Sequence, residues 1–188
     1  MTIELSSPSH PPQPARYNSG MIWLHWATAL LVMLLFLSAE IWDFTEKGSA
    51  LRNGLKALHY GAGITLLCVF VARLAWRLAS LASIPPEEQG LMRLAAKAAH
   101  GLLYLGLAAQ ICLGFLWRWS QGKPVDFFGL FAIADPIGVS PDYRHLLGEM
   151  HSFIAWTIIG LAAVHALAAI YHHTVLKDGV LMKMMPGR

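Results

Sequence analysis

The chain has 188 residues, of which 56% are hydrophobic and only 13% are charged, and its formal net charge is +3. Soluble globular proteins usually carry about 25% charged residues, so this balance excludes an ordinary soluble domain. The small positive charge is explained by membrane orientation and gives no reason to expect binding to nucleic acid.

The first 16 residues differ in composition from the rest of the chain. They are rich in proline, which opposes both helix and core formation, so residues 1–16 are expected to be a disordered cytoplasmic tail. The apolar stretch that follows is too long for a cleaved signal peptide and lacks the short basic segment that precedes one. Residues 17–188 are expected to form one membrane domain.

Four apolar stretches are expected to cross the bilayer, at about residues 21–41, 55–76, 95–117 and 146–171. Each has about 20 residues or more, the length that a helix needs to cross a hydrocarbon core about 30 Å thick. Backbone groups in lipid must be paired within their own segment, which favours helices over open strands. The predicted fold class is all-α, an integral membrane four-helix transmembrane bundle.

Basic residues in the loops and near the ends of the spans predict the orientation of the bundle. An even number of spans places both termini on one side, and eight basic residues against six favour the cytoplasm for that side. The side of the termini would hold Arg16, Arg73, Arg77, Arg93, Lys97, Lys177, Lys183 and Arg188. The opposite, outer side would hold Lys47, Arg52, Lys56, Arg118, Lys123 and Arg144.

Three further features describe the spans and loops. Glycines 61, 63, 101, 106 and 114 would let either a neighbouring helix or a flat cofactor approach closely. Residues 120–144 contain three prolines and three phenylalanines, which suggests a loop or short helix that lies on the membrane and covers part of what is beneath. Cys68 and Cys112 are expected to be packing residues, and the absence of a Cys-x-x-Cys-His motif excludes covalent haem attachment.

Four histidines in three of the spans carry the functional prediction. His151 and His165 are 14 residues apart, which on a helix is about 21 Å of rise and within about 40° of a whole number of turns. With the N-terminus inside, His25 and His165 lie at the inner level, and His59 and His151 lie at the outer level. Paired neutral imidazoles are suited to the iron of an electron-transfer haem, so each pair is expected to ligate one haem.

Several other side chains have weaker predicted roles at the inner side. His100 opens the third span and is interpreted as binding a haem propionate or supporting a ligand. Arg73 and Arg77 lie one turn apart, where they either reach for the membrane surface or pair with propionates. His172 shares a face with His165, and with Trp26 it is a candidate for lining a quinone pocket.

Taken together, these segments resemble bacterial cytochrome b561, a family related to the membrane cytochrome b subunits of nickel-iron hydrogenases and formate dehydrogenases. The resemblance runs from Tyr17 to Pro186, and the short loops are closer to stand-alone members than to subunits docked on a partner. The matching segments are residues 22–26 (IWLHW), 58–63 (LHYGAG) with Arg73 and Arg77, 99–104 (AHGLLY), 149–151 (EMH), and 164–166 (VHA) with His172, His173, Lys177, Asp178 and residues 184–186 (MMP).

The resemblance implies an inner-membrane bundle with two b-type haems on His25, His165, His59 and His151, and exchange of electrons with the quinone pool. Stand-alone members are superoxide:ubiquinone oxidoreductases, so the expected function is oxidation of superoxide to O2 at the outer face and reduction of ubiquinone at the inner face. Basic residues of the outer loops would attract the superoxide anion.

Two alternatives stay open. The chain could instead conduct electrons for a separate periplasmic dehydrogenase or hydrogenase, without a substrate site of its own. A soluble redox subunit and a second copy of the chain are both candidate partners. A non-redox reading, in which the histidines of a small transporter bind a metal such as zinc, leaves the two level-matched pairs unexplained. Haem content separates the transporter from the two redox functions, and stable co-purification with a soluble redox subunit would favour the conduit.

Overall fold

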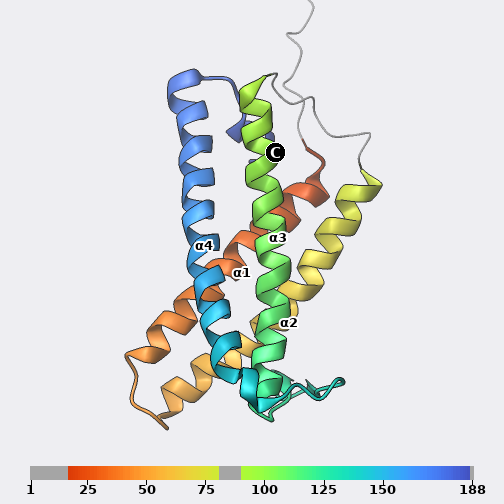
Figure 1. Cartoon of the computed structure of the whole chain (residues 1–188). Helices are drawn as coiled ribbons and strands as arrows, with labels where there is room; N and C mark the ends of the chain where they lie inside the picture. The colour runs from red at the N-terminus through yellow and green to blue at the C-terminus, as the bar shows by residue number, and fades with distance from the viewer. Residues whose placement is uncertain (1–16, 81–89, 187–188) are drawn as a thin grey trace, which may run out of the picture.

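The structure, a computed structural model, describes residues 17–80 and 90–186 and consists mainly of four long helices (Figure 1). They are α1 (Ser19–Asp43), α2 (Ala50–Ala79), α3 (Leu91–Ser120) and α4 (Arg144–Tyr171). All four are long and apolar enough to cross a membrane, which confirms the predicted four-helix bundle. The tail predicted for residues 1–16 lies outside the described residues.

Polar side chains define where the first two helices begin. Asn18 accepts a hydrogen bond from the backbone N–H of Met21, and Ser49 accepts one from that of Arg52. Such caps satisfy backbone donors that the first turn of a helix leaves unpaired. The Arg52 guanidinium also donates to the carbonyl oxygens of Trp42 and Thr45, both at 2.8 Å, and so fastens the short connection between α1 and α2.

The four helices pack as two pairs. Helix α1 lies along α2 and α3 lies along α4, whereas α2 and α3 contact each other only sparsely. Leu66, Leu107 and Ile158 form a buried cluster from α2, α3 and α4, and partly buried apolar residues such as Leu31 and Phe70 surround it. This apolar layer lies midway along the bundle and separates the interior into two halves.

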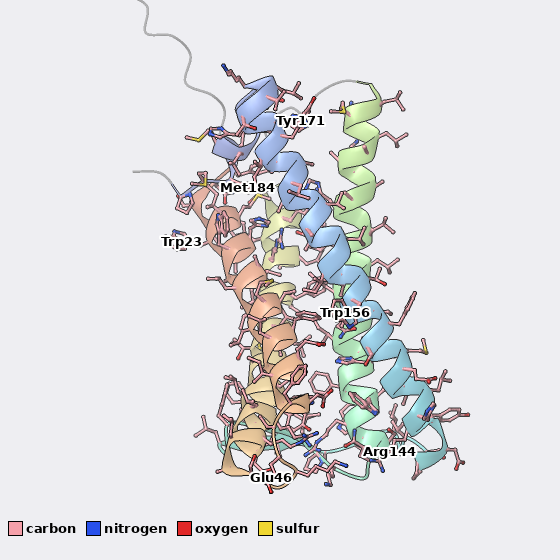
Figure 2. All side chains as sticks on the ribbon, turned by 90° about the vertical axis from the view of Figure 1, so that its left-hand side faces the viewer. Trp23, Glu46, Arg144, Trp156, Tyr171 and Met184 are labelled. Atoms are coloured by element: carbon pink, nitrogen blue, oxygen red, sulfur yellow. The ribbon has the colours of Figure 1, made fainter. Side chains whose placement is uncertain are left out.

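One end of the bundle, called here the hairpin end, carries a small antiparallel sheet. Strands β1 (Val125–Phe127) and β2 (Phe131–Ile133) pair around a turn in which Phe128 and Gly129 have φ values of +50° and +75°. Figure 2 shows Glu46 and Arg144 at this end. The prediction of an irregular loop or short helix was therefore wrong for this part of residues 120–144, because two residues with positive φ build a tight hairpin turn.

The opposite end, called the terminal end, holds both ends of the described chain. Trp23, Tyr171 and Met184 lie there (Figure 2). After α4 the chain continues as a π-helix (His172–Leu176), turns at Lys177 with φ of +54°, and forms a short 3-10 helix, η4 (Leu181–Lys183). The Trp26 indole N–H donates to the Met184 carbonyl oxygen at 2.9 Å, which ties this C-terminal segment to α1.

The two cysteines do not have the predicted packing role. Cys68 and Cys112 are both exposed on the described surface and are free thiols. Periodicity along a span that is apolar on every face does not reveal which face points to lipid, which is why the sequence misplaced them.

Candidate functional site

The bundle brings the four singled-out histidines together as the two expected pairs. The ring centres of His25 and His165 are 6.4 Å apart at the terminal end, and those of His59 and His151 are 6.4 Å apart at the hairpin end. The planes of the two rings meet at 70° in both pairs. The hydrophobic layer of Leu66, Leu107 and Ile158 lies between the two pairs along the helices.

A cavity of about 420 Å³ adjoins the hairpin-end pair and is lined by side chains of all four helices. His59 and His151 both face it, as does Gly63, around which a Cβ would meet no atom within 4 Å. At Gly114 an added Cβ would lie 3.3 Å from the His151 ring. Glycine at these two positions therefore leaves room beside the histidines, one of the two explanations that the sequence offered.

His59 is oriented by polar groups of α1. Its Nδ1 lies 3.0 Å from the Leu35 carbonyl oxygen and 3.2 Å from the hydroxyl of Ser38, which is 3% exposed. The Ser38 hydroxyl itself donates to the same carbonyl oxygen at 2.9 Å. A hydrogen bond from Nδ1–H to a backbone carbonyl leaves Nε2 with its lone pair for a metal. Sequence reasoning had not singled out Ser38.

His151 has a different environment on α4. Its Nε2 lies 3.1 Å from the amide nitrogen of Gln110, a residue of α3 that the sequence analysis missed. Among the described residues, His151 Nδ1 and Gln110 Oε1 are buried without a hydrogen-bond partner. A lone amide within the apolar run around Gln110 was the available signal, because an uncompensated polar group in a span is costly.

The terminal-end pair is surrounded by cationic and imidazole groups. Arg73 of α2 donates to Nδ1 of His25 at 2.9 Å. The ring of His100 lies 5.3 Å from that of His165, and the indole of Trp26 lies 5.7 Å from His25. The structure thus places Arg73 and His100 beside this pair, and their predicted roles toward a haem stay predictions.

The other predicted residues at this end are farther from the pair or are engaged elsewhere. His172 Nδ1 is paired with the Asp178 carboxylate, whose other oxygen accepts from the Val180 backbone N–H. Arg77 lies 5.7 Å from the Tyr104 ring and lines a separate cleft between α2 and α3. His172 and Trp26, predicted to line a quinone pocket, both hold the C-terminal segment in place.

Charged side chains of both signs reach the hairpin-end cavity. Lys56, Arg118 and Arg144 line it together with Glu40 and Asp43. Arg118 lies over the Tyr60 ring at 4.4 Å and donates to the Pro124 carbonyl oxygen, and these two contacts fix its guanidinium. Three of the six basic residues predicted for this side therefore line one cavity.

The described residues contain no cluster of three or more His, Cys, Asp or Glu side chains that could hold a metal ion by itself. The paired rings suit a metal that brings its own equatorial ligands. A family model for prokaryotic cytochrome b561 matches residues 16–187. The chain belongs to this family.

Named relatives agree with the family. The chain is 32% identical to cytochrome b561 homolog 1 and 31% identical to cytochrome b561 homolog 2 of Escherichia coli, over 92% of its own length and 98% and 92% of theirs. It is 30% identical to the probable superoxide oxidase CybB of Yersinia pestis over 92% of this chain and 97% of that protein. Cytochromes b561 bind b-type haem and carry electrons, and the four apolar helices indicate a multi-pass protein of the bacterial inner membrane.

The residues at the two pairs fit b-type haem. In both pairs the ring centres are 6.4 Å apart, which would leave room between them for one metal ion bound through metal–nitrogen bonds of about 2.0 Å. At the hairpin end the open space at Gly63 and the unpaired polar atoms of His151 and Gln110 adjoin the place that the group would take. The oriented His59 ring completes the donor set.

Proposed function

We propose that this cytochrome b561 holds two haems, one on His25 and His165 and the other on His59 and His151. The observation that carries the proposal is the equal separation of 6.4 Å in the two pairs. The 14 residues between His151 and His165 support it, because they put both rings on one face of α4 about 21 Å apart. Bound haem supplies one-electron oxidation and reduction at each pair.

The orientation follows from the basic residues. We place the terminal end in the cytoplasm, because the positive-inside rule favours the side with more lysine and arginine. Arg73, which contacts His25, would pair with a haem propionate at that end, since a guanidinium binds a carboxylate through two hydrogen bonds.

We further propose that the chain oxidises superoxide at the periplasmic hairpin end and reduces ubiquinone at the cytoplasmic terminal end. Two superoxide anions give two O2 and two electrons, and one ubiquinone takes up those electrons with two protons to form ubiquinol. Lys56, Arg118 and Arg144 at the mouth of the cavity would attract the anion. The name of the Yersinia relative supports this substrate.

The test uses the purified, haem-loaded chain. Haem content per chain and a reduced-minus-oxidised spectrum are measured first, and two low-spin b-type haems are expected. Superoxide is then generated enzymatically, and reduction of a short-chain ubiquinone is followed by absorbance, with catalase present to remove peroxide. Quinone reduction that a superoxide dismutase abolishes is expected.

The electron-conduit function makes the opposite prediction. In that case the isolated chain would not reduce quinone with superoxide, and a soluble redox subunit would co-purify with it. A chain that folds in haem-replete cells but contains no haem would contradict both functions.

A further inference from the structure

A second cavity, called here the α2–α3 cleft, lies between these two helices near the terminal end and has a volume of about 350 Å³. Helices α2 and α3 contact each other only sparsely there. Leu74 and Leu78, which line the cleft from α2, are 41% and 61% exposed, so the cleft opens on the outer surface of the bundle. Because both helices are long and apolar enough to cross a membrane, a ligand can enter the cleft from the bilayer.

The lining of the cleft changes from basic to apolar with depth in the membrane. Arg77 is two residues from the end of α2, and Lys97 lies in the second turn of α3. Trp76, next to Arg77, donates from its indole to Asn18, the N-cap of α1, which places this level at the membrane surface. Deeper lining residues are Leu74, Gly101 and Tyr104. A phospholipid has the same order, with its phosphate at the surface and its acyl chains below.

Positive charge at the surface level of the cleft has no partner of opposite charge. Among the described residues neither Arg77 nor Lys97 forms an ion pair, and the described lining contains no carboxylate. Arg73 and Arg77, one turn apart, lie 5.1 and 5.7 Å from the same Tyr104 ring. Like charges at this spacing on a helix repel each other, and a bound phosphate would offset that repulsion.

The cleft also has room for an acyl chain below the charges. At Gly101 an added Cβ would meet no atom within 4 Å, so a chain can lie against the backbone of α3. Leu74 and Leu78 offer it an apolar surface on the facing helix. The ammonium group of a zwitterionic headgroup would find no carboxylate in the described lining. The cleft therefore favours a phospholipid with a net negative charge over a zwitterionic one.

We propose that the α2–α3 cleft binds one anionic phospholipid from the leaflet at the terminal end, with Arg77 and Lys97 on its phosphate and an acyl chain between Leu74 and Gly101. Basic pockets between spanning helices bind anionic headgroups in this way. The lipid fills the seam between the two helix pairs, and because it binds the folded bundle it also stabilises the fold. The site is independent of the electron donor and acceptor.

Native mass spectrometry of the haem-loaded protein tests the site directly. The protein is freed of native lipid by detergent exchange and titrated with phosphatidylglycerol or with phosphatidylcholine of the same acyl chains. One phosphatidylglycerol per chain is expected to bind about tenfold more tightly than phosphatidylcholine. At about ten times its dissociation constant it should raise the unfolding temperature by about 3 °C. Equal binding of the two lipids would overturn the proposal.

Paired substitutions separate the cleft from the general positive charge of this end. The double variant Arg77→Gln/Lys97→Gln is expected to bind phosphatidylglycerol about tenfold more weakly, with an unchanged haem content and reduced spectrum. The control Arg93→Gln/Lys183→Gln also removes one arginine and one lysine from the terminal end, outside the cleft, and should bind like the unmodified protein. An equal loss of affinity in both double variants would assign the effect to surface charge and overturn the site.

A variant that keeps every charge tests the place of the acyl chain. Gly101→Leu fills the space beside α3, so phosphatidylglycerol should bind about tenfold more weakly, the loss expected when about two methylene groups leave the cleft. Gly160→Leu is the matched control, because Gly160 is also an exposed helical glycine with no atom within 4 Å of an added Cβ. Unchanged binding by Gly101→Leu would contradict the proposal.

Two other ligands of the basic residues give different results. If they hold a haem propionate, Arg77→Gln/Lys97→Gln will change the haem content or reduced spectrum and leave the binding of phosphatidylglycerol unchanged. If they select a free phosphate ion, millimolar inorganic phosphate will displace the lipid, and Gly101→Leu will have no effect. Either result overturns the lipid site.

Discussion

The two ends of the bundle hold histidine pairs of the same geometry in different surroundings. At the hairpin end, His59 is bonded to a carbonyl oxygen and the pair adjoins a cavity of about 420 Å³ with charges of both signs. At the terminal end, Arg73 lies against His25, and Arg77 and Lys97 line the nearby cleft. The backbone thus repeats one arrangement of paired histidines, and the neighbouring side chains give each pair different surroundings.

Removing one ligand from each pair is the most severe test of this comparison. His59→Ala and His25→Ala are each expected to reduce the haem content from two to one, because a single imidazole loses its partner. Haem per chain is measured from the pyridine haemochrome spectrum of folded protein. His145→Ala is the control, since that side chain is 86% exposed in a surface pair with Glu149. Retention of two haems in either ligand variant would contradict the pairing.

The substitution Arg73→Gln tests whether the electrostatic difference between the two ends affects the haem potentials. A positive charge near an iron favours its reduced form, so removing this charge should lower the midpoint potential of one haem. We expect a tenfold change in the redox equilibrium, about 59 mV for one electron. A potentiometric titration measures both haems. Arg144→Gln, at the exposed mouth of the other cavity, should produce a smaller shift in the other haem. If Arg73→Gln shifted the midpoint potentials of both haems equally, the charge of Arg73 would not act mainly on the haem at its own end.

The hairpin can be tested at its contact with α2. A Cβ at residue 61 would lie 2.5 Å from the Phe128 ring, so Gly61→Ala forces the ring to move. Because Phe128 is 48% exposed and can shift, we expect a loss of about 1 kcal/mol, at the low end for overpacking. Thermal unfolding in detergent measures it. In the double variant with Phe128→Ala the cost of Gly61→Ala should vanish, and a cost that persists would locate the strain elsewhere.

The smallest effect is expected in the loop after β2, outside the membrane. Slight desolvation raises the pKa of Asp135, but backbone N–H groups of Ile137, Val139 and Gly138 donate to its carboxylate and bring the pKa below its usual value. A lowered pKa in the folded state means that the stabilisation is present above the unfolded pKa of about 3.9 and is lost as the pH falls below it. Asp135→Asn should speed amide hydrogen exchange at residues 137–139 at neutral pH. An unchanged exchange rate would show that contacts other than those with the Asp135 carboxylate hold the loop.

Much of the fold was predictable because lipid restricts the choices of the backbone. A stretch of about 20 apolar residues must form a helix, and four such stretches with short connections must form a bundle. The helices begin and end within five residues of the predicted spans. The level of each histidine follows from its place along a span, so the sequence also predicted which rings would meet.

Other features of the site depended on the tertiary structure. Gln110 and Ser38 contact the histidines because of how α3 and α1 are oriented about their axes. The sequence of a span that is apolar on every face does not reveal that orientation. The hairpin required the turn at Phe128 and Gly129, and its position over Gly61 required the approach of residues far apart in sequence. The α2–α3 cleft arises because the helices pack as two separate pairs.

The sequence by itself therefore determined the membrane fold, the four spans and the two histidine levels, because hydrophobicity and helical rise are local properties. Only the tertiary structure decided which face of each helix points inward, where Arg73 and His100 lie relative to the terminal-end pair, and where the cavities are. Those properties depend on packing between helices, and helix packing in lipid is decided by side-chain fit instead of hydrophobic contrast.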